Sequence, residues 1–250
     1  MNFDFSEDQK FLGNEARKFL EAECPMTAVR LVLNDDDVSH NETVWNKVVE
    51  MGWLGTAIPE EHGGLGLGLL EVCVLAEEMG RVLAPVPWAS TVYFFTEAPK
   101  LAGSNEQQAE ILPRIVSGDV VGCYAASEGP GNPAADTLKT TFDGSTLSGT
   151  KVPVTDGDIA THAIVLAKEG SGASLVLVDL TGEGVTRKTL QTLDPTRSHA
   201  EIVFDKAPAT RLGNAGDGEM LNDQVLDHAA VLLAFEQLGG ASRALEMATD

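Results

Sequence analysis

The glycine run between Gly63 and Gly68 is a candidate for a ligand-binding loop. Its composition, Gly-Gly-Leu-Gly-Leu-Gly, is that of loops whose backbone N–H groups cradle phosphate. Such loops follow a strand directly and open a helix. A helical pattern precedes this one, so we interpret the run as a structural connection.

The three cysteines do not predict a metal site. Cys24, Cys73 and Cys123 lie far apart, and no pair has the short separation of metal-binding motifs. We expect free thiols, which suit a reducing compartment. The N-terminal stretch MNFDFSEDQKF is acidic and lacks the basic and apolar regions of a signal peptide, which predicts a cytoplasmic protein.

Two carboxylates, Glu236 and Glu246, lie on an apolar helix predicted over residues 220–249. A buried carboxylate can act as a general base. Pairing with arginine or exposure to solvent is the commoner role on a helix, so we nominate no catalytic base. The pair Gly239-Gly240 costs roughly 1 kcal/mol per residue inside a helix, and the close approach of another backbone would explain it.

Composition and charge exclude several classes of protein. Of 250 residues, 43% are hydrophobic and 22% are charged, which is typical of a globular chain with a sizeable core. No apolar run is long enough to span a bilayer. The net charge of −21 would repel nucleic acid and anionic lipid, so neither partner is expected.

The periodicity of apolar residues divides the chain into three parts. Residues 1–118 have helical periodicity, and we expect an N-terminal α-helical domain there. Residues 119–215 have the short alternating runs of a middle β-barrel or β-sandwich domain. Residues 216–250 predict the first helix of a C-terminal helical bundle, with no stop signal before Asp250, so the sequence ends within an element. The predicted class is α+β and multidomain.

Caps and turns sharpen these assignments. Ser6 with Gln9 and Ser104 with Gln107 have the spacing of capping boxes. Asp143-Gly144 is a strong hairpin signal. We expect one helix with an apolar face from Phe11 to Leu20, and further helices over residues 43–52, 69–83 and 104–118. We expect strands over residues 138–142, 146–155, 163–167, 175–179, 185–190 and 200–204.

Five segments, in order, resemble the acyl-CoA dehydrogenase family. They are Met51-Gly-Trp-Leu-Gly-Thr-Ala-Ile-Pro-Glu-Glu-His-Gly-Gly-Leu-Gly, Glu77-Glu-Met-Gly-Arg-Val-Leu-Ala-Pro, Leu147-Ser-Gly-Thr-Lys with Val154-Thr-Asp-Gly, Leu193-Asp-Pro-Thr-Arg, and Phe235-Glu-Gln-Leu-Gly-Gly-Ala-Ser-Arg-Ala-Leu-Glu-Met-Ala. The fourth is similar to a loop of one branch of the family. The resemblance covers essentially the whole sequence.

This resemblance implies FAD between the middle and C-terminal domains, with its adenosine end reaching another subunit. It implies α,β-desaturation of an acyl-CoA thioester, in which a carboxylate removes the α-proton and a hydride leaves the β-carbon for the flavin. Electrons would pass to an electron-transfer flavoprotein. The subunit-bridging cofactor implies a homo-oligomer or a heteromer with a related subunit.

The resemblance also implies cofactor-binding positions. Tyr124, Ala126 and Ser127 match a family strand whose hydroxyl and backbone amides meet the flavin edge, and Thr155 matches a second hydroxyl residue near it. Ser127 could instead simply end a strand. Pro153 stands where the family often has an aromatic ring against the flavin, and losing that ring removes about 0.5–1.5 kcal/mol of stacking.

Substrate positions follow in the same way. Glu128 matches a frequent family glutamate, although a solvated carboxylate would look the same. Ala135 replaces a serine of the segment that helps to hold CoA. Asp227 matches an aspartate near the thioester end, or else is a partner of His228 or of the backbone. Three residues later, Ala230 replaces an arginine of the family.

Three functions stay open at this point. The chain is an FAD-dependent acyl-CoA dehydrogenase whose catalytic base lies outside this sequence. Alternatively, it is a non-catalytic or half-site subunit of a heteromeric enzyme for a bulky or steroid-type acyl-CoA, which the residues at positions 135, 153 and 230 favour. The third function, acyl-CoA binding or scaffolding without flavin, requires the Ser127 and Thr155 hydroxyls to be incidental.

Overall fold

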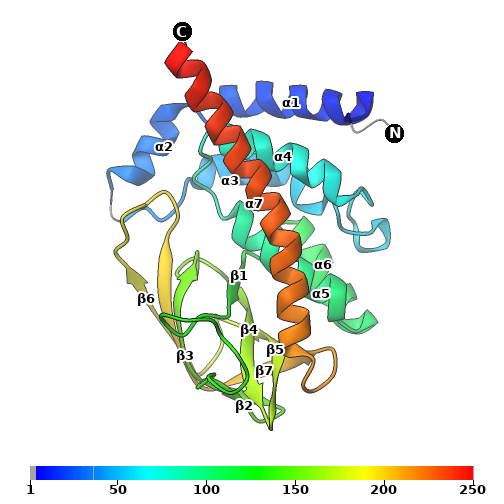
Figure 1. The fold of residues 1–250 in the computed structure, drawn as a ribbon, viewed down its shortest axis with the longest axis vertical. Helices are drawn as coiled ribbons and strands as arrows, with labels where there is room; N and C mark the ends of the chain where they lie inside the picture. Colours follow the sequence, from blue (N-terminus) through cyan, green and yellow to red (C-terminus); the bar gives the residue numbers. More distant parts are fainter. Residues whose placement is uncertain (1–3, 36, 250) are drawn as a thin grey trace.

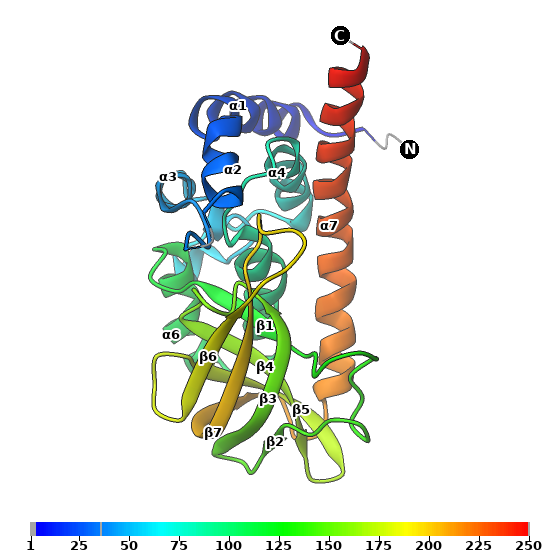
Figure 2. The ribbon, with the colours of Figure 1, turned by 90° about the vertical axis from the view of Figure 1, so that its left-hand side faces the viewer.

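The computed structural model describes residues 4–35 and 37–249. A helical part and a β-barrel lie at opposite ends of the molecule, and one long helix, α7, runs along both (Figure 1 and Figure 2). The predicted class, a helical part followed by a β-barrel and a further helix, is confirmed. The first three residues of the N-terminal stretch and Asp250, where the last helix lacks a stop signal, lie outside the described residues.

The helical part contains two capping boxes that the sequence predicts. The Gln9 N–H donates to the Ser6 hydroxyl at 3.2 Å, and Ser104 and Gln107 repeat the arrangement. The glycine run leads from a short 3-10 helix into a helix, so its interpretation as a connection is confirmed. The elements are α1 (Glu7–Glu23), α2 (Met26–Leu33), α3 (Glu42–Glu50), η1 (Trp53–Gly55), η2 (Glu60–His62), α4 (Leu69–Arg81), the π-helix η3 (Ala89–Phe95), α5 (Glu97–Ala102) and α6 (Asn105–Val116).

The sequence does not predict five of these elements: α2, η1, η2, η3 and α5. The π-helix η3 has no clear 3.6-residue period, because π geometry places successive side chains differently from an α-helix. Its residues are almost all buried, including Tyr93 and Phe95. Burial on every side removes the alternation on which a prediction from periodicity depends.

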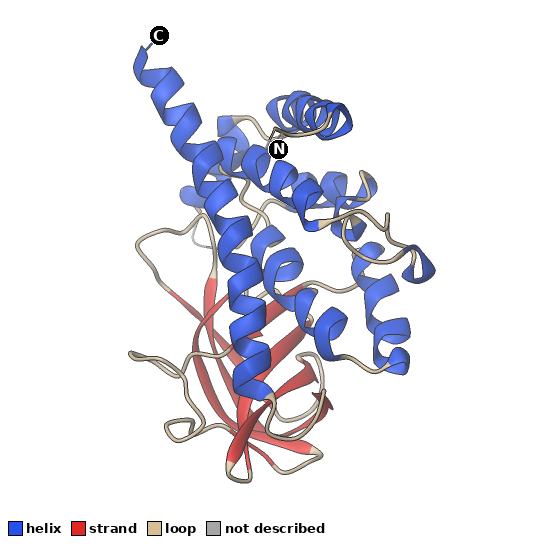
Figure 3. Cartoon of the chain, turned by 45° about the vertical axis from the view of Figure 1, so that its right-hand side comes forward, coloured by secondary structure: helices blue, strands red, loops and turns tan. Residues whose placement is uncertain are grey.

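The β part is a closed barrel. Strands β4, β2, β3, β7 and β5 follow one another in hydrogen-bonded order, and β5 pairs back onto β4. Strand β1 pairs with β4 in parallel, and β6 pairs with β7. The strands, which gather at one end of the molecule in Figure 3, are β1 (Gly122–Ala125), β2 (Thr141–Phe142), β3 (Thr146–Thr155), β4 (His162–Glu169), β5 (Gly172–Asp179), β6 (Val185–Leu190) and β7 (His199–Leu212).

Predicted and observed strands differ mainly at their ends. Strands β3 and β6 have the predicted bounds, and the Asp143-Gly144 turn joins β2 to β3. The strand expected over 138–142 is reduced to its last two residues. Strand β7 extends eight residues beyond the predicted end at 204. The domain boundaries at residues 118 and 215 stay predictions.

Helix α7 (Gly218–Thr249) crosses α4 with backbone against backbone. A Cβ atom on Gly239 would lie 1.8 Å from the Glu77 carbonyl oxygen, and one on Gly80 would lie 1.8 Å from the Glu236 carbonyl oxygen. The expected close approach at Gly239 is therefore confirmed, whereas at Gly240 the nearest atom is 3.5 Å away. Over the described residues, no helix is both long and apolar enough to span a membrane.

Candidate functional site

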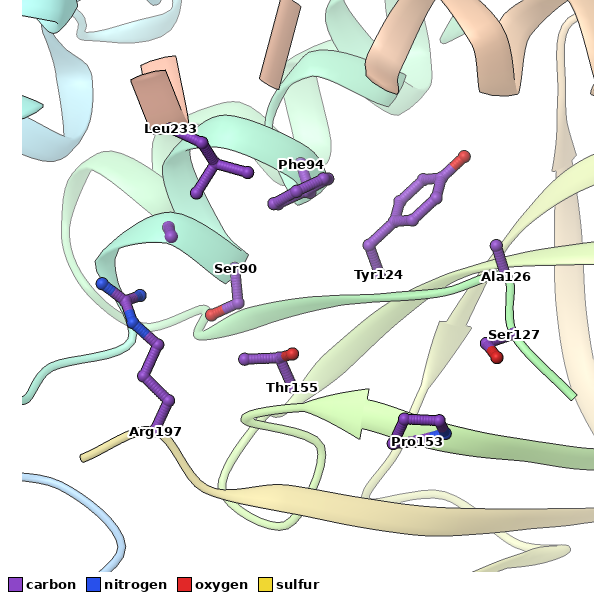
Figure 4. Close-up of a pocket in the computed structure, with 10 residues that line it drawn as sticks. Ser90, Phe94, Tyr124, Ala126, Ser127, Pro153, Thr155, Arg197 and Leu233 are labelled. Carbon is purple, nitrogen blue, oxygen red and sulfur yellow. The ribbon is translucent and has the colours of Figure 1, made fainter. Parts of the chain in front are cut away.

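A pocket of about 340 Å³ lies where the barrel, η3 and α7 meet (Figure 4). This volume is within the range of roughly 300–1,000 Å³ found for small-molecule sites. All five predicted cofactor positions line it. The lining residues are Ala89, Ser90, Phe94, Tyr124, Ala126, Ser127, Pro153, Thr155, Arg197 and Leu233.

One side of this pocket, which we call the strand wall, consists of the five predicted residues. Tyr124 lies on β1, Ala126 and Ser127 follow that strand, and Pro153 and Thr155 end β3. The two segments are joined by a 2.9 Å hydrogen bond from the Val152 N–H to the Ser127 carbonyl. Main-chain pairing therefore brings together residues that lie about thirty positions apart in sequence.

The strand wall offers hydroxyl groups that are only weakly engaged. The Ser127 hydroxyl lies 3.2 Å from the Gly129 carbonyl, and the Thr155 hydroxyl lies 3.3 Å from Nε2 of His199. Both distances are long for hydrogen bonds of a hydroxyl. The Tyr124 hydroxyl instead donates to Asn222 of α7 at 3.0 Å, and burial raises the pKa of Tyr124, so it remains a neutral phenol.

The opposite side, which we call the helix wall, consists of Ala89, Ser90 and Phe94 of η3 and Leu233 of α7 (Figure 4). The sequence predicts no role for these residues. The run of aromatic and small residues after Pro87 was the available signal, but it has no period. Phe94 lies against Tyr124 with ring centroids 6.0 Å apart. Aromatic surface in the pocket thus comes from these two rings, while position 153 supplies none.

Among the described residues that line the pocket, Arg197 is the one cation, and it forms an ion pair with Glu236 of α7. Glu246 pairs with Arg81, whose Nη1 is 2.8 Å from its carboxylate. Of the two roles expected for these helix carboxylates, pairing with arginine or exposure to solvent, both residues have the first. None of the described residues that line the pocket is itself a carboxylate.

A buried carboxyl lies directly behind the helix wall. The Ser90 hydroxyl donates to Asp156 Oδ2 at 2.6 Å, and the Asp156 side chain is almost inaccessible. Burial raises the pKa of Asp156 to about 6, against the smaller opposing effects of the Ser90 hydrogen bond and the Arg197 charge. Asp156 has a φ of 56°, a left-handed conformation that aspartate tolerates better than most residues. This contact ties η3 to the end of β3.

The three predicted substrate positions lie outside this pocket. Glu128 and the loop after it border a second hollow of about 450 Å³. The Ala135 N–H donates to Glu219 of α7 at 2.8 Å. Asp227 is exposed on α7, and the neighbouring His228 contacts Glu97 at 3.1 Å, not Asp227. Their roles toward a substrate stay predictions.

Known proteins resemble this chain along nearly its whole length. Residues 6–119 match the model of the acyl-CoA dehydrogenase N-terminal domain. The short-chain specific acyl-CoA dehydrogenase of Sus scrofa mitochondria is 30% identical over 99% of this chain and 63% of its own. This chain therefore spans less than two thirds of that relative.

Solved structures give the same result for the fold. The acyl-CoA dehydrogenase of Bacillus anthracis complexed with FAD superposes with a TM-score of 0.88 at 26% identity, covering 98% of this chain and 44% of its own. A variant of the Tcur3481-Tcur3483 steroid ACAD superposes with a TM-score of 0.83 at 33% identity, covering 96% and 65%. Together with the barrel and the pocket between β1 and β3, these similarities identify the chain as a member of the acyl-CoA dehydrogenase family.

Proposed function

We propose that this chain binds FAD in the pocket between the strand wall and the helix wall and takes part in the α,β-desaturation of an acyl-CoA thioester. One observation carries the proposal. Five residues that the family resemblance predicts as cofactor positions, from two distant segments, line a single pocket. Two of them, Ser127 and Thr155, carry hydroxyl groups, which a hydrogen-bonding cofactor can use.

The residues present fit a planar, hydrogen-bonding cofactor. Ser127 and Thr155 carry weakly engaged hydroxyls, and Phe94 and Tyr124 add apolar ring surface. Bound FAD would accept the hydride of the desaturation step. The protein side chains would orient it and exclude water, because most of the pocket lining is apolar. Acyl-CoA as substrate and an electron-transfer flavoprotein as electron acceptor are part of this proposal.

A second candidate is a half-site subunit of a heteromeric dehydrogenase. The pocket lining, as far as the described residues go, contains no carboxylate, and the nearby Glu236 is paired with Arg197. The α-proton would then be removed by a group from a related subunit or from a further part of the protein. The similarity to the Tcur3481-Tcur3483 steroid ACAD supports this candidate, with a bulky acyl group as the substrate class.

Visible absorbance of the gel-filtered protein tests both candidates. We would measure the full-length protein alone and after co-expression with any related chain encoded beside it. A flavin spectrum from the protein alone, bleached anaerobically by an acyl-CoA, supports a self-sufficient enzyme. A colourless protein that turns yellow only with its partner supports the half-site subunit. Protein that binds no flavin in either state would contradict the proposal.

A further inference from the structure

Lys151 is a fully buried lysine directly behind the strand wall. Its side chain has 0% exposure, and its ammonium group donates to the Glu128 carboxylate at 2.8 Å and to the Ala126 carbonyl at 3.0 Å. A buried ammonium group is costly unless it is paired and hydrogen-bonded. Burial lowers the pKa of Lys151 to about 8 even with Glu128 beside it, so the charge is retained at neutral pH at an energetic cost.

Glu128 is fixed just as firmly. Its carboxylate accepts the backbone N–H groups of Lys139 at 2.8 Å and Thr140 at 2.9 Å in addition to the Lys151 ammonium. Burial raises the pKa of Glu128, but these hydrogen bonds outweigh burial and lower it to about 2. The carboxylate is therefore ionised and held from three directions, which leaves it little freedom to contact a substrate.

The position of Lys151 on β3 explains how a buried charge can serve the pocket. A register shift between Lys151 and Val154 interrupts the alternation of the strand. Lys151 and Val154 are consequently both buried, while Pro153 and Thr155 line the pocket. Because of this bulge, one short segment supplies Pro153 and Thr155 to the pocket and places Lys151 behind it.

Lys151 binds the peptide group between Ala126 and Ser127 through the Ala126 carbonyl. In a trans peptide the C=O and N–H point in opposite directions. Because Lys151 binds the Ala126 carbonyl, the Ser127 N–H must point away from Lys151. The next carbonyl, that of Ser127, accepts from the Val152 N–H, so this segment is fixed at two successive peptide groups.

We propose that Lys151, held by Glu128, is a positioning residue that fixes the Ala126–Ser127 peptide so that its N–H is presented to the flavin in the pocket. The inference rests on the proposed function, since it assumes that flavin occupies this pocket. It makes the ion pair a determinant of cofactor affinity as well as of barrel stability. A purely structural ion pair would affect stability alone.

The test compares FAD affinity with stability in matched variants. Lys151→Met leaves the Glu128 charge buried and unpaired, so we expect both FAD affinity and stability to fall. The double variant Lys151→Met/Glu128→Gln removes both charges and keeps one amide oxygen, which can accept from the Lys139 or the Thr140 N–H but not from both, since these two groups bind different oxygens of Glu128. We expect it to regain part of the stability while its FAD affinity, followed by flavin fluorescence, stays lower by about tenfold or more. Arg211→Met, which breaks the part-exposed pair with Glu169 on other strands, is the control and should leave FAD affinity unchanged.

A pH profile gives a second readout. FAD affinity of the unmodified protein should decline above pH about 8, as Lys151 loses the proton that holds Glu128, and the double variant should lack this decline. A double variant that binds FAD as tightly as the unmodified protein overturns the inference and leaves the proposed function intact. If the unmodified protein binds no FAD, alone or with a related subunit, the proposed function fails and the inference fails with it.

Discussion

The strand wall and the helix wall of the pocket are built by different means. The strand wall is held by the hydrogen bond from the Val152 N–H of β3 to the Ser127 carbonyl, just after β1, and by the buried Lys151–Glu128 pair. The helix wall is held by contacts between elements far apart in sequence, chiefly the α4–α7 crossing and the hydrogen bond from Ser90 to Asp156. The strand wall is therefore a property of the barrel, whereas the helix wall depends on how the helices dock.

Because the two walls are held differently, substitutions in them should affect different properties of the protein. Changes to the strand wall should alter the contacts of the flavin and leave the helices in place. Changes to the docking of the helix wall should alter stability and its dependence on pH, because Ser90 of η3 binds a buried ionisable carboxyl behind the pocket, that of Asp156. Substitutions at positions whose contacts are known test whether the two walls respond differently.

The largest expected effect is at the α4–α7 crossing. Gly239→Ala places a Cβ atom 1.8 Å from a backbone oxygen of α4, a contact that only movement of one helix can relieve. We expect the free energy of unfolding to fall by about 3 kcal/mol or more. Gly240→Ala is the matched control: its nearest contact is 3.5 Å, so the higher helix propensity of alanine should be neutral or stabilising by up to about 1 kcal/mol. Equal effects of the two substitutions in urea denaturation would refute the close crossing.

The second effect concerns the pH dependence of the helix wall. The pKa of Asp156 is raised from 3.8 to about 6. Burial is the main cause and the Asp158 charge adds to it, while the charges of Arg197 and His199 oppose it. The folded protein thus binds more protons than the unfolded chain in this range, and stability should fall as pH rises. For this one group we expect a loss on the order of 2–3 kcal/mol between pH about 4 and about 7.

Asp156→Asn removes this titration and keeps an acceptor for the Ser90 hydroxyl. Urea denaturation at several pH values should show the difference between the two proteins growing toward neutral pH, with the variant the more stable. Asp227→Asn on the exposed face of α7 serves as the control, and its profile should run parallel to that of the unmodified protein. Parallel profiles for Asp156→Asn as well would mean that the carboxyl is not buried as described.

The smallest effect is expected at Asp227. Since it is exposed and lies outside the pocket lining, Asp227→Ala should change stability by no more than about 0.5 kcal/mol. It should leave FAD affinity unchanged as well. If Asp227 lies near the thioester, as the family resemblance implies, the KM for acyl-CoA of the catalytically complete protein should rise. An unchanged KM would remove Asp227 from the substrate site.

The five residues of the strand wall could be predicted because they match positions of the family, and the strand that carries two of them also has a local signal. Alternation over 146–155 and the turn at Asp143-Gly144 define β3, and the residues before Glu128 resemble a family strand. The bulge that buries Lys151 could not be anticipated, because an ideal strand would place residues 151, 153 and 155 on one face.

The helix wall could not be predicted, for a different reason. The π-helix η3 is buried on nearly all sides, so its apolar residues have no period to detect. Ser90 and Asp156 are 66 residues apart and meet only after the helices dock onto the barrel. Gly239 was the exception, because a glycine in an apolar helix is itself a local sign of a distant contact.

Titration of a strand-wall double variant with FAD tests whether the flavin binds in this pocket. Ser127→Ala/Thr155→Val removes the two weakly engaged hydroxyls of the strand wall, and Thr141→Val/Ser148→Ala makes the same chemical changes at paired positions of β2 and β3 outside the pocket. Each would be measured alone and with any related subunit. We predict that the pocket variant binds FAD about tenfold or more weakly than the unmodified protein, while the control stays within about twofold. Equal FAD affinity in all three proteins would contradict the assignment of this pocket to the flavin.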